Sequence, residues 1–258
     1  MRIANPVYEV YTRRLRHQLA GAELPRHVGL IMDGNRRWAR KKGLADTRLG
    51  HRYGAEHAEN VLAWCESLGI RHVTVFLCST ENLQNRRNDE IDFLMQVVED
   101  LVTDRLGRPD SGWQLHVAGS MDVLPDTTAR ALKNAMEATR DCTTDAHVTL
   151  AIGYGGRQEI IDAFRDLLYE NASQGRSLAD IADTLTAEDL AAHLYTANQP
   201  DPDLVIRTSG EQRLSNFLLW QSADAELYFC EAYWPAFREL DFLRALRNYA
   251  SRHRRYGK

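Results

Sequence analysis

The chain has 258 residues, of which 44% are hydrophobic, so it is long enough to bury one full core. Its formal net charge of −4 argues against nucleic-acid binding through overall charge, and any anionic substrate must be held by local clusters of arginine. No apolar run approaches the roughly 18 residues that a membrane-spanning helix needs, and no apolar signal core is present, so we expect a cytoplasmic protein.

Residues 1–23 are predicted to contain an amphipathic helix. Val7, Tyr11, Leu15 and Leu19 are spaced four apart, which places them on one apolar stripe with arginines beside it. Such a helix could cover a hydrophobic opening or make a peripheral contact with a membrane surface. Packing of the same stripe on the body of the domain is at least as good an interpretation.

The rest of the chain alternates apolar runs with helical patterns and contains no linker. The apolar runs are residues 28–33, 73–78, 114–119, 147–154, 203–208 and 226–234. The helical patterns are residues 90–106, 127–141, 157–172, 186–195 and about 239–255. Strands that are apolar throughout and separated by helices are typical of a buried sheet, so we predict an α/β fold with a central, mainly parallel sheet flanked by helices. Sites in such folds lie outside the carboxyl ends of the strands.

The segment 27–43 has the strongest chemical pattern. An apolar strand is followed by Asp33 and Gly34, and then by a helix start that carries Arg36 and Arg37. A strand-to-helix turn offers free backbone N–H groups to a phosphate, and the arginines add charge-assisted donors. A carboxylate among phosphate donors makes sense when Mg²⁺ bridges it to the phosphate. An ordinary turn followed by a solvated helix face explains the same residues about equally well.

The segment 203–221 predicts a second oxyanion site. Arg207, Arg213 and Ser215 lie around a glycine turn at the end of a buried strand. The alternative is a surface pair of Arg207 with Glu211, which would contribute little stability. Two independent phosphate-like sites in one domain make that alternative less attractive.

Two further strand ends carry weaker signals. Ser79, Glu81 and Asn82 could position a substrate, and Arg86 or Arg87 could reach a phosphate, although polar loops at strand ends are common. The glycine-rich stretch 153–157 lacks the GK[ST] of a Walker A motif and matches no dinucleotide fingerprint. It predicts a tight connection from a strand to a helix.

Taken in order, five motifs resemble those of the cis-prenyltransferases, the family of undecaprenyl and other Z-prenyl diphosphate synthases. The motifs are HxxxxMDGNxRWA at 27–39, STEN at 79–82, GYGGR at 153–157, DLVIRTSGExRxSNFLLWQ at 203–221 and AELYFxxxxWP at 225–235. The resemblance covers about residues 24–257 and makes 24–258 the catalytic domain. It implies a Mg²⁺-dependent, homodimeric enzyme that condenses isopentenyl diphosphate with an allylic diphosphate, releases diphosphate and leaves a Z double bond.

The resemblance also implies roles for individual residues. Asp33 corresponds to the aspartate that works with Mg²⁺, and Glu226 to a second carboxylate of the metal site. Asn35, Ser79 and Asn82, with Asp33, match catalytic positions near the reacting atoms. The positions that match substrate-binding residues are Gly34, Arg36, Arg37, Trp38, His51, Leu77, Ser79, Thr80, Glu81, Leu83, Arg86, Arg87, Arg207, Arg213 and Ser215. Residues 254–257 resemble a tail that reaches the partner subunit's site.

Two departures from the family pattern leave questions open. The arginine that the family usually has three residues before the glycine of GH is Thr47 here, with Arg48 adjacent. The loop after Asn82 reads LQNRR, so either Arg86 or Arg87 could take the role of the usual arginine.

The length of the product is predicted from Leu77. Long-chain members tend to keep a small residue two positions before STEN, where this chain has Leu77, and Leu83 replaces the usual aromatic residue. These features resemble the short-chain actinobacterial Z-farnesyl diphosphate synthases. Each buried isoprene unit stabilises the bound chain by roughly 4 kcal/mol, so the depth of the apolar tunnel sets the length of the product. If Leu77 narrows that tunnel, the product is short, about fifteen carbons, and is made from geranyl diphosphate.

Three alternatives stay open at this point. The first is a longer-chain decaprenyl or undecaprenyl diphosphate synthase, and the second is a lavandulyl-type synthase that makes branched products. The third is a non-catalytic partner subunit, but such subunits typically lose the first aspartate, which this chain keeps as Asp33.

Overall fold

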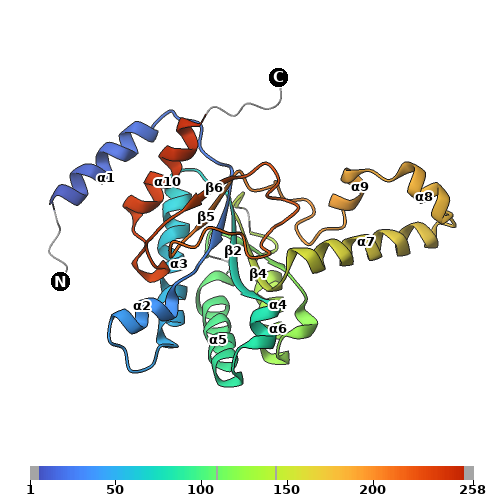
Figure 1. The fold of residues 1–258 in the computed structure, drawn as a ribbon, viewed down its shortest axis with the longest axis horizontal. Helices are drawn as coiled ribbons and strands as arrows, with labels where there is room; N and C mark the ends of the chain where they lie inside the picture. Colours follow the sequence, from blue (N-terminus) through green and yellow to red (C-terminus); the bar gives the residue numbers. More distant parts are fainter. Residues whose placement is uncertain (1–5, 109, 143, 253–258) are drawn as a thin grey trace.

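A computed structural model describes residues 6–108, 110–142 and 144–252, and its centre is one six-stranded sheet (Figure 1). The strands are β1 (His27–Ile31), β2 (His72–Ser79), β3 (Gln114–Ala118), β4 (His147–Tyr154), β5 (Leu204–Arg207) and β6 (Glu226–Phe229). Their order is β3-β4-β2-β1-β5-β6, and every neighbouring pair is parallel. The predicted parallel sheet is confirmed, and each predicted apolar run contains a strand, although the run 226–234 forms a strand only as far as Phe229.

The described residues form ten α-helices, of which α1 precedes the first strand and α10 follows the last. They are α1 (Pro6–Leu19), α2 (Asn35–Lys41), α3 (Leu49–Ser67), α4 (Thr80–Asn85), α5 (Asn88–Leu101), α6 (Asp126–Thr139), α7 (Gly156–Ser173), α8 (Leu178–Thr184), α9 (Ala187–Ala191) and α10 (Glu239–Ser251). Short turns of helix complete the set: η1 (Val102–Leu106), which is a π-helix, η2 (Met121–Val123) and η3 (Trp234–Ala236).

The two faces of the sheet are covered differently. Alternate strand residues point to opposite faces, so Leu30 joins a large core cluster with residues of α3, α5, α6 and α10, whereas Ile31 joins a small cluster on the other face. The small cluster is closed by Phe217 and Leu218, both fully buried, from the long loop between β5 and β6. Helices therefore cover one face, and a loop that carries a predicted phosphate site covers much of the other.

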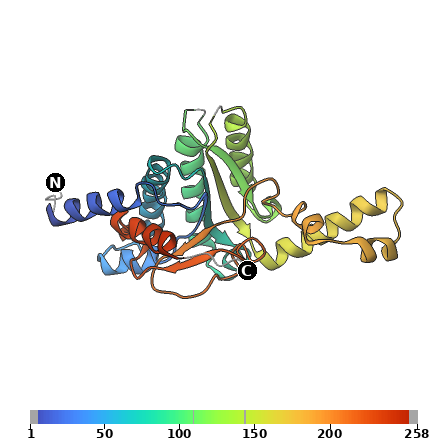
Figure 2. The same ribbon diagram turned by 90° about the horizontal axis from the view of Figure 1, so that it is seen from above.

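Helix α7 leaves the body of the molecule, with α8 at its far end and α9 lying back alongside it (Figures 1 and 2). We call residues 156–191 the arm. Ser177 and Thr186 each accept a hydrogen bond from a backbone N–H three residues later, so capping boxes begin α8 and α9. The predicted helix 186–195 ends at Ala191, because the chain then turns and Tyr195 N donates to Glu159 Oε1 at 3.0 Å.

The N-terminal helix α1 packs along α10. Leu15 and Leu19, from the predicted apolar stripe, are 0% and 4% exposed, and Arg16 Nε donates to Glu239 Oε1 at 2.6 Å. The apolar stripe is therefore covered by the body of the domain, which was one of the two interpretations of the sequence. No helix among the described residues is long and apolar enough to cross a membrane.

Candidate active site

A cavity of about 550 Å³ lies at the carboxyl ends of β1, β2 and β5. These strands are neighbours in the sheet, so their last residues and the loops that follow them meet at one edge. The cavity is lined by Ile31, Met32, Asp33, Arg36, Phe76, Leu77, Cys78, Ser79, Glu81, Asn82, Arg86, Arg207, Arg213, Ser215 and Asn216. The fold thus brings residues of three predicted segments, 27–43, 78–87 and 203–221, into one site.

Asp33 lies at the centre of the charged groups. Its Oδ2 accepts a hydrogen bond from Arg207 Nη2 at 2.9 Å, and its Oδ1 accepts one from Arg37 Nη2 at 3.1 Å. Burial favours the neutral acid, but Arg207 and then Arg37 stabilise the carboxylate and together hold the pKa of Asp33 below its usual value. Asp33 is therefore a fixed negative charge at neutral pH.

The backbone around Asp33 is held by Thr208 and shaped by Gly34. Thr208 Oγ1 accepts a hydrogen bond from Asp33 N at 3.0 Å and donates one to Asp33 O at 2.7 Å. Gly34 has a φ of +98°, and a Cβ there would lie 2.7 Å from Cδ1 of Tyr233. The DGN turn therefore requires glycine at its second position, both for conformation and for space.

Arg207 connects Asp33 to the loop after β5. Its side chain is 5% exposed, and its Nη1 donates to Arg213 O at 2.6 Å and to Ser215 Oγ at 2.7 Å. The loop holds several non-glycine residues in the left-handed region, namely Ser209, Ser215, Asn216 and Leu218. Such strain persists only where surrounding contacts fix the backbone, and it is concentrated here at the predicted oxyanion site.

Helix α4 distinguishes Arg86 from Arg87. Ser79 caps the helix by accepting a hydrogen bond from Asn82 N at 3.0 Å. Arg86 follows the last turn, lines the cavity and is 18% exposed, with its Nη1 3.2 Å from Glu90 Oε1. Arg87 is 85% exposed and pairs with Asp89, so the structure brings Arg86 to the site and leaves Arg87 outside it.

A second chamber of about 60 Å³, lined mostly by apolar residues, adjoins the main cavity, because Met32, Leu77 and Arg86 line both. Its other walls are Asn35, His51, Gly54, Ala55, Leu94, Val97, Val98 and Leu101. His51 is 9% exposed, and burial, with Arg86 and Arg36 nearby, lowers its pKa to about 4, so its ring is neutral at pH 7. The site therefore places a charged region beside an apolar one.

The glycine of the GH pair has a packing role. A Cβ on Gly50 would lie 2.2 Å from the backbone oxygen of Asn35, so only glycine allows α3 to approach the start of α2 this closely. The side-chain Oδ1 of Asn35 is buried and has no hydrogen-bond partner among the described residues. It faces Gly54 of α3, where a Cβ would lie only 2.5 Å away.

Some predicted site residues lie away from both cavities. Trp38 packs on Tyr53 with ring centroids 5.1 Å apart, and Leu83 packs against the large core cluster. Thr80 lies at the start of α4, beside Glu81, and does not line the cavity. Arg48 pairs with Asp46 at 2.9 Å rather than with a cavity residue.

Glu226 lies at the other end of the sheet. It is the first residue of β6 and is level with Leu204, whereas Arg207 is level with Phe229, the last residue of that strand. Glu226 forms an ion pair with Arg252. The structure therefore does not bring Glu226 and Asp33 together within one chain. Residues 254–257, the predicted tail, lie outside the described residues.

Two groups that shape the site were not predicted, and the role of a third was not. Glu90 pairs with Arg36 at 3.0 Å and Arg86 at 3.2 Å, Asn216 lines the cavity, and Thr208, one of the hydroxyls at the predicted oxyanion site, fixes Asp33. The position of Asn216 directly after Ser215 was a signal that could have found it. No sequence signal pointed to Glu90.

The residues present fit Mg²⁺ that binds together with a diphosphate. Among the described residues, no group of three or more His, Cys, Asp or Glu side chains is arranged to hold a metal ion. Asp33 is 30% exposed and faces a cavity lined by arginines. Because Mg²⁺ commonly takes one or two carboxylates and completes its shell with substrate phosphate oxygens and water, one carboxylate among phosphate donors suits it.

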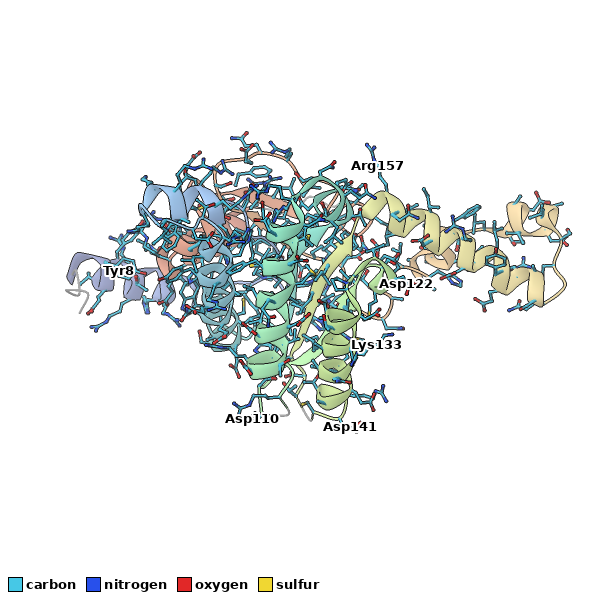
Figure 3. All side chains as sticks on the ribbon, turned by 90° about the horizontal axis from the view of Figure 1, so that it is seen from below. Tyr8, Asp110, Asp122, Lys133, Asp141 and Arg157 are labelled. Atoms are coloured by element: carbon cyan, nitrogen blue, oxygen red, sulfur yellow. The ribbon has the colours of Figure 1, made fainter. Side chains whose placement is uncertain are left out.

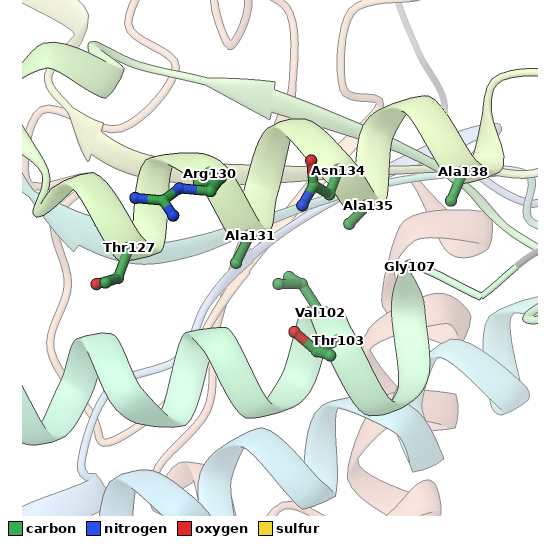
Figure 4. A pocket seen from close by; sticks show the side chains of 9 residues that line it. All are labelled: Val102, Thr103, Gly107, Thr127, Arg130, Ala131, Asn134, Ala135 and Ala138. Atoms are coloured by element: carbon green, nitrogen blue, oxygen red, sulfur yellow. The ribbon is translucent and has the colours of Figure 1, made fainter.

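A groove of about 380 Å³ between α6 and η1 offers different chemistry (Figure 4). Its walls are mostly small side chains such as Ala131, Ala135 and Ala138, and Arg130 is its one charged lining residue. It has no carboxylate and no second cation, so it does not match the predicted diphosphate sites. The carboxyl-edge cavity does, and it can hold two oxyanions beside an apolar chain.

Comparisons with known proteins agree with this chemistry. A family model described as putative undecaprenyl diphosphate synthase matches residues 31–257. An isoprenyl transferase of Streptomyces fradiae is 67% identical over 100% of both chains, and a (2Z,6E)-farnesyl diphosphate synthase of Mycolicibacterium smegmatis is 49% identical over 100% of this chain and 98% of its own. The structure of a lavandulyl diphosphate synthase from Lavandula x intermedia aligns with a TM-score of 0.83 at 33% identity, covering 91% of this chain and 99% of that one. The chain therefore belongs to the cis-prenyltransferase family and is an enzyme of the Z-isoprenyl diphosphate synthase type.

Proposed function

We propose that the enzyme condenses isopentenyl diphosphate with geranyl diphosphate and releases a Z-prenyl diphosphate of about fifteen carbons, (2Z,6E)-farnesyl diphosphate. The observation that carries this proposal is the position of Leu77, which lies between the charged cavity and an apolar chamber of only about 60 Å³. A growing chain must enter that chamber to bury each added unit. Where the chamber is small, elongation stops early. Relatives that are 48–49% identical and are named short-chain or farnesyl diphosphate synthases support the same product.

In the proposed mechanism the two diphosphates occupy opposite sides of Asp33. The allylic diphosphate is bound near Arg36 and Arg86, and isopentenyl diphosphate is bound by Arg213 and Ser215. Arg207 is buried behind both groups and orients them by its hydrogen bonds to Asp33 and Ser215. Holding the two reactants in one geometry supplies a large part of the rate enhancement.

Charge builds on the diphosphate oxygens when the allylic C–O bond breaks. The fixed guanidinium groups of Arg36 and Arg86 stabilise that charge in a partly closed cavity. Asp33 would hold Mg²⁺, which would supply further neutralisation of the leaving group's charge. A carbon–carbon bond then forms at the alkene of isopentenyl diphosphate, and its C2 proton leaves. Because two arginines hold the pKa of Asp33 low, Asp33 is a weak base, which favours a diphosphate oxygen as the proton acceptor.

We also propose that the enzyme works as a homodimer. The arm projects from the body, and its helix α7 exposes Ile161, Phe164 and Tyr169 by 51%, 42% and 70% (Figure 2). Exposed apolar groups on one projecting helix favour burial against a second copy. The homodimer implied by the family resemblance supports the same arrangement.

The branched-product alternative rests on the alignment with lavandulyl diphosphate synthase, whose structure was solved with dimethylallyl diphosphate. Substrate choice separates the two functions. An enzyme that makes branched products joins two molecules of dimethylallyl diphosphate, whereas the proposed enzyme requires isopentenyl diphosphate.

The proposal is tested by incubating purified protein with labelled isopentenyl diphosphate and Mg²⁺. Dimethylallyl, geranyl and E,E-farnesyl diphosphate are offered separately, and the product is identified by chain length and double-bond geometry. We expect a Z-configured product of about fifteen carbons from geranyl diphosphate. Products of many isoprene units would overturn the short-chain assignment, and product formed from dimethylallyl diphosphate alone would favour the branched alternative.

The role of Leu77 is tested by Leu77→Ala. Removing the side chain joins the main cavity to the chamber, so the product is expected to lengthen by at least one isoprene unit. Burial of each added unit stabilises the bound chain by roughly 4 kcal/mol. Leu24→Ala is the matched control, since Leu24 packs against the same core away from the cavities. An unchanged product distribution in Leu77→Ala would show that Leu77 does not set the length.

A further inference from the structure

Three of the five sequence motifs meet at one side chain, Asn216. Its Nδ2 donates to Glu81 Oε1 at 3.0 Å, and its Oδ1 accepts from Arg157 N at 2.9 Å. Its backbone oxygen accepts a hydrogen bond from Gly156 N at 2.8 Å. Asn216 therefore links the STEN segment, the GYGGR segment and the loop that carries the oxyanion site.

The space around Asn216 explains the glycine at position 155. A Cβ on Gly155 would lie 2.9 Å from Asn216 Nδ2 and 3.1 Å from Thr80 Oγ1. The base of the arm must therefore lack a side chain where α4 and the loop come together. Figure 3 shows Arg157 at this base, where α7 leaves the body.

Backbone conformation alone would be a simpler reason for asparagine. Asn216 has a φ of +65°, and asparagine tolerates the left-handed region better than most residues. Conformation alone, however, does not require both ends of the amide to be bonded. Ser215, with a φ of +50°, adopts the same region without an amide. The two side-chain bonds of Asn216 are thus a separate feature.

The position of Asn216 couples these bonds to the substrates. Asn216 follows Ser215, whose Oγ accepts from Arg207 Nη1 at 2.7 Å. Glu81 lies on α4 between Ser79 and Asn82, and all three line the cavity. A displacement of Asn216 would move Ser215 relative to α4. The cavity residues of the loop and those of α4 would then no longer be correctly placed relative to each other.

We infer that Asn216 is a positioning residue that locks α4 to the loop of Arg213 and Ser215 through its hydrogen bond to Glu81, and so sets the affinity for isopentenyl diphosphate. The inference rests on the proposed function only for the identity of that ligand. Asn216 acts through Ser215 and Glu81 rather than on the reacting atoms.

A donor–acceptor exchange tests the hydrogen bond. Asn216→Asp keeps an acceptor for Arg157 N but sets a carboxylate against Glu81, whereas Glu81→Gln in the same protein supplies a donor to that carboxylate. The double variant has the same net charge as the wild type. We expect Asn216→Asp to raise the Kd for isopentenyl diphosphate, measured by titration calorimetry on the full chain, by about tenfold or more. In the Glu81→Gln background the same change should raise Kd by about threefold at most.

Kinetics and unfolding separate positioning from a general loss of structure. Asn216→Asp should raise KM for isopentenyl diphosphate while KM for the allylic substrate stays within about twofold and the Tm within a few degrees. An equal effect of Asn216→Asp in both backgrounds would overturn the inference. So would a loss of Tm without a change in Kd.

Asn216→Gly isolates the backbone contribution, because glycine accepts the positive φ and removes the amide. We expect its Kd to rise as in Asn216→Asp, and a wild-type Kd would show that conformation alone explains the residue. Wild-type protein that binds isopentenyl diphosphate without Asp33-dependent turnover would refute the proposed function, and the same titrations would still decide the role of Asn216. Wild-type protein that does not bind isopentenyl diphosphate would refute both.

Discussion

Polar side chains at the two ends of the sheet differ in charge and in surroundings. At the carboxyl edge, Asp33 and Arg207 are kept charged and face a cavity. At the amino edge, His27, His72 and His147 stand level on β1, β2 and β4. The rings of His72 and His147 stack 4.8 Å apart, and His116 Nε2 lies 3.0 Å from His147 Nδ1.

Burial and partners explain the difference. His27 is 1% exposed, and its ring nitrogens lie 2.6 Å from Pro200 O and 2.8 Å from Thr74 Oγ1. Burial lowers the pKa of His27 to about 4, so its ring is neutral at pH 7. At the carboxyl edge, strained backbone and clustered charge surround the proposed substrate site, whereas His27 at the amino edge is buried, hydrogen-bonded and neutral.

The largest effect that the comparison predicts is at Asp33. Asp33→Ala removes the carboxylate that two arginines hold and that is proposed to bind Mg²⁺, so kcat/KM for prenyl transfer should fall at least about 10³-fold. His116→Gln, at the other end of the sheet, should leave kcat/KM within about twofold. Steady-state assays with labelled isopentenyl diphosphate measure both. Asp33→Ala with more than a tenth of wild-type activity, or equal losses at the two edges, would break the comparison.

The next effect concerns stability at the amino edge. Because His27 has a folded-state pKa of about 4 and an unfolded pKa of about 6.5, protons bind the unfolded chain more tightly over this range. The stability that neutral, buried His27 contributes is therefore present above about pH 6.5 and is lost as the pH falls. The free energy of unfolding should drop by about 3 kcal/mol between pH 7 and pH 4 from this group. His27→Gln should weaken the pH dependence of the free energy of unfolding between about pH 7 and pH 4, as measured by urea titration at each pH. An equal pH dependence in the two proteins would contradict the lowered pKa of His27.

The smallest effect sharpens the description of the carboxyl edge. Arg86 lines the cavity, whereas Arg87 is 85% exposed, so the two adjacent arginines form a matched pair. Arg86→Ala should lower kcat/KM by about tenfold or more through the loss of a charge-assisted contact to diphosphate. Arg87→Ala should stay within about twofold. A reversed order would place Arg87, and not Arg86, against the substrate.

The sequence predicts the strands well because both faces of the sheet are buried. The run 147–154, for example, is mostly apolar, and all but its first residue are buried, so no alternation was needed to find it. The order of the strands could not be predicted, since nothing local says that β1 lies between β2 and β5. Helix α5 was predicted to continue to residue 106, but from Val102 the chain changes to a π-helix, a change that the apolar pattern of the sequence did not indicate.

The site was predictable where a motif and a strand end coincide. Asp33, Arg207 and Ser215 satisfy that condition and meet in the cavity. Glu226 does not satisfy it, because it is the first residue of its strand. In a parallel sheet the first residue of a strand lies at the edge opposite the cavity. The choice between Arg86 and Arg87 depended on where α4 ends, which is set by one hydrogen bond to Ser79 at its start and by the turn at Arg86.

The contact between α1 and α10 has a consequence for synthesis. Arg16 and Glu239, which pair across this contact, are 223 positions apart in the chain. A ribosome that adds about 5–20 residues per second needs roughly 10–45 s to make that stretch. Until α10 emerges, Leu15 and Leu19 lack the helix that packs along α1. Helix α1 is thus made well before its partner helix, and a nascent chain that stalls before residue 239 leaves this apolar face incompletely covered.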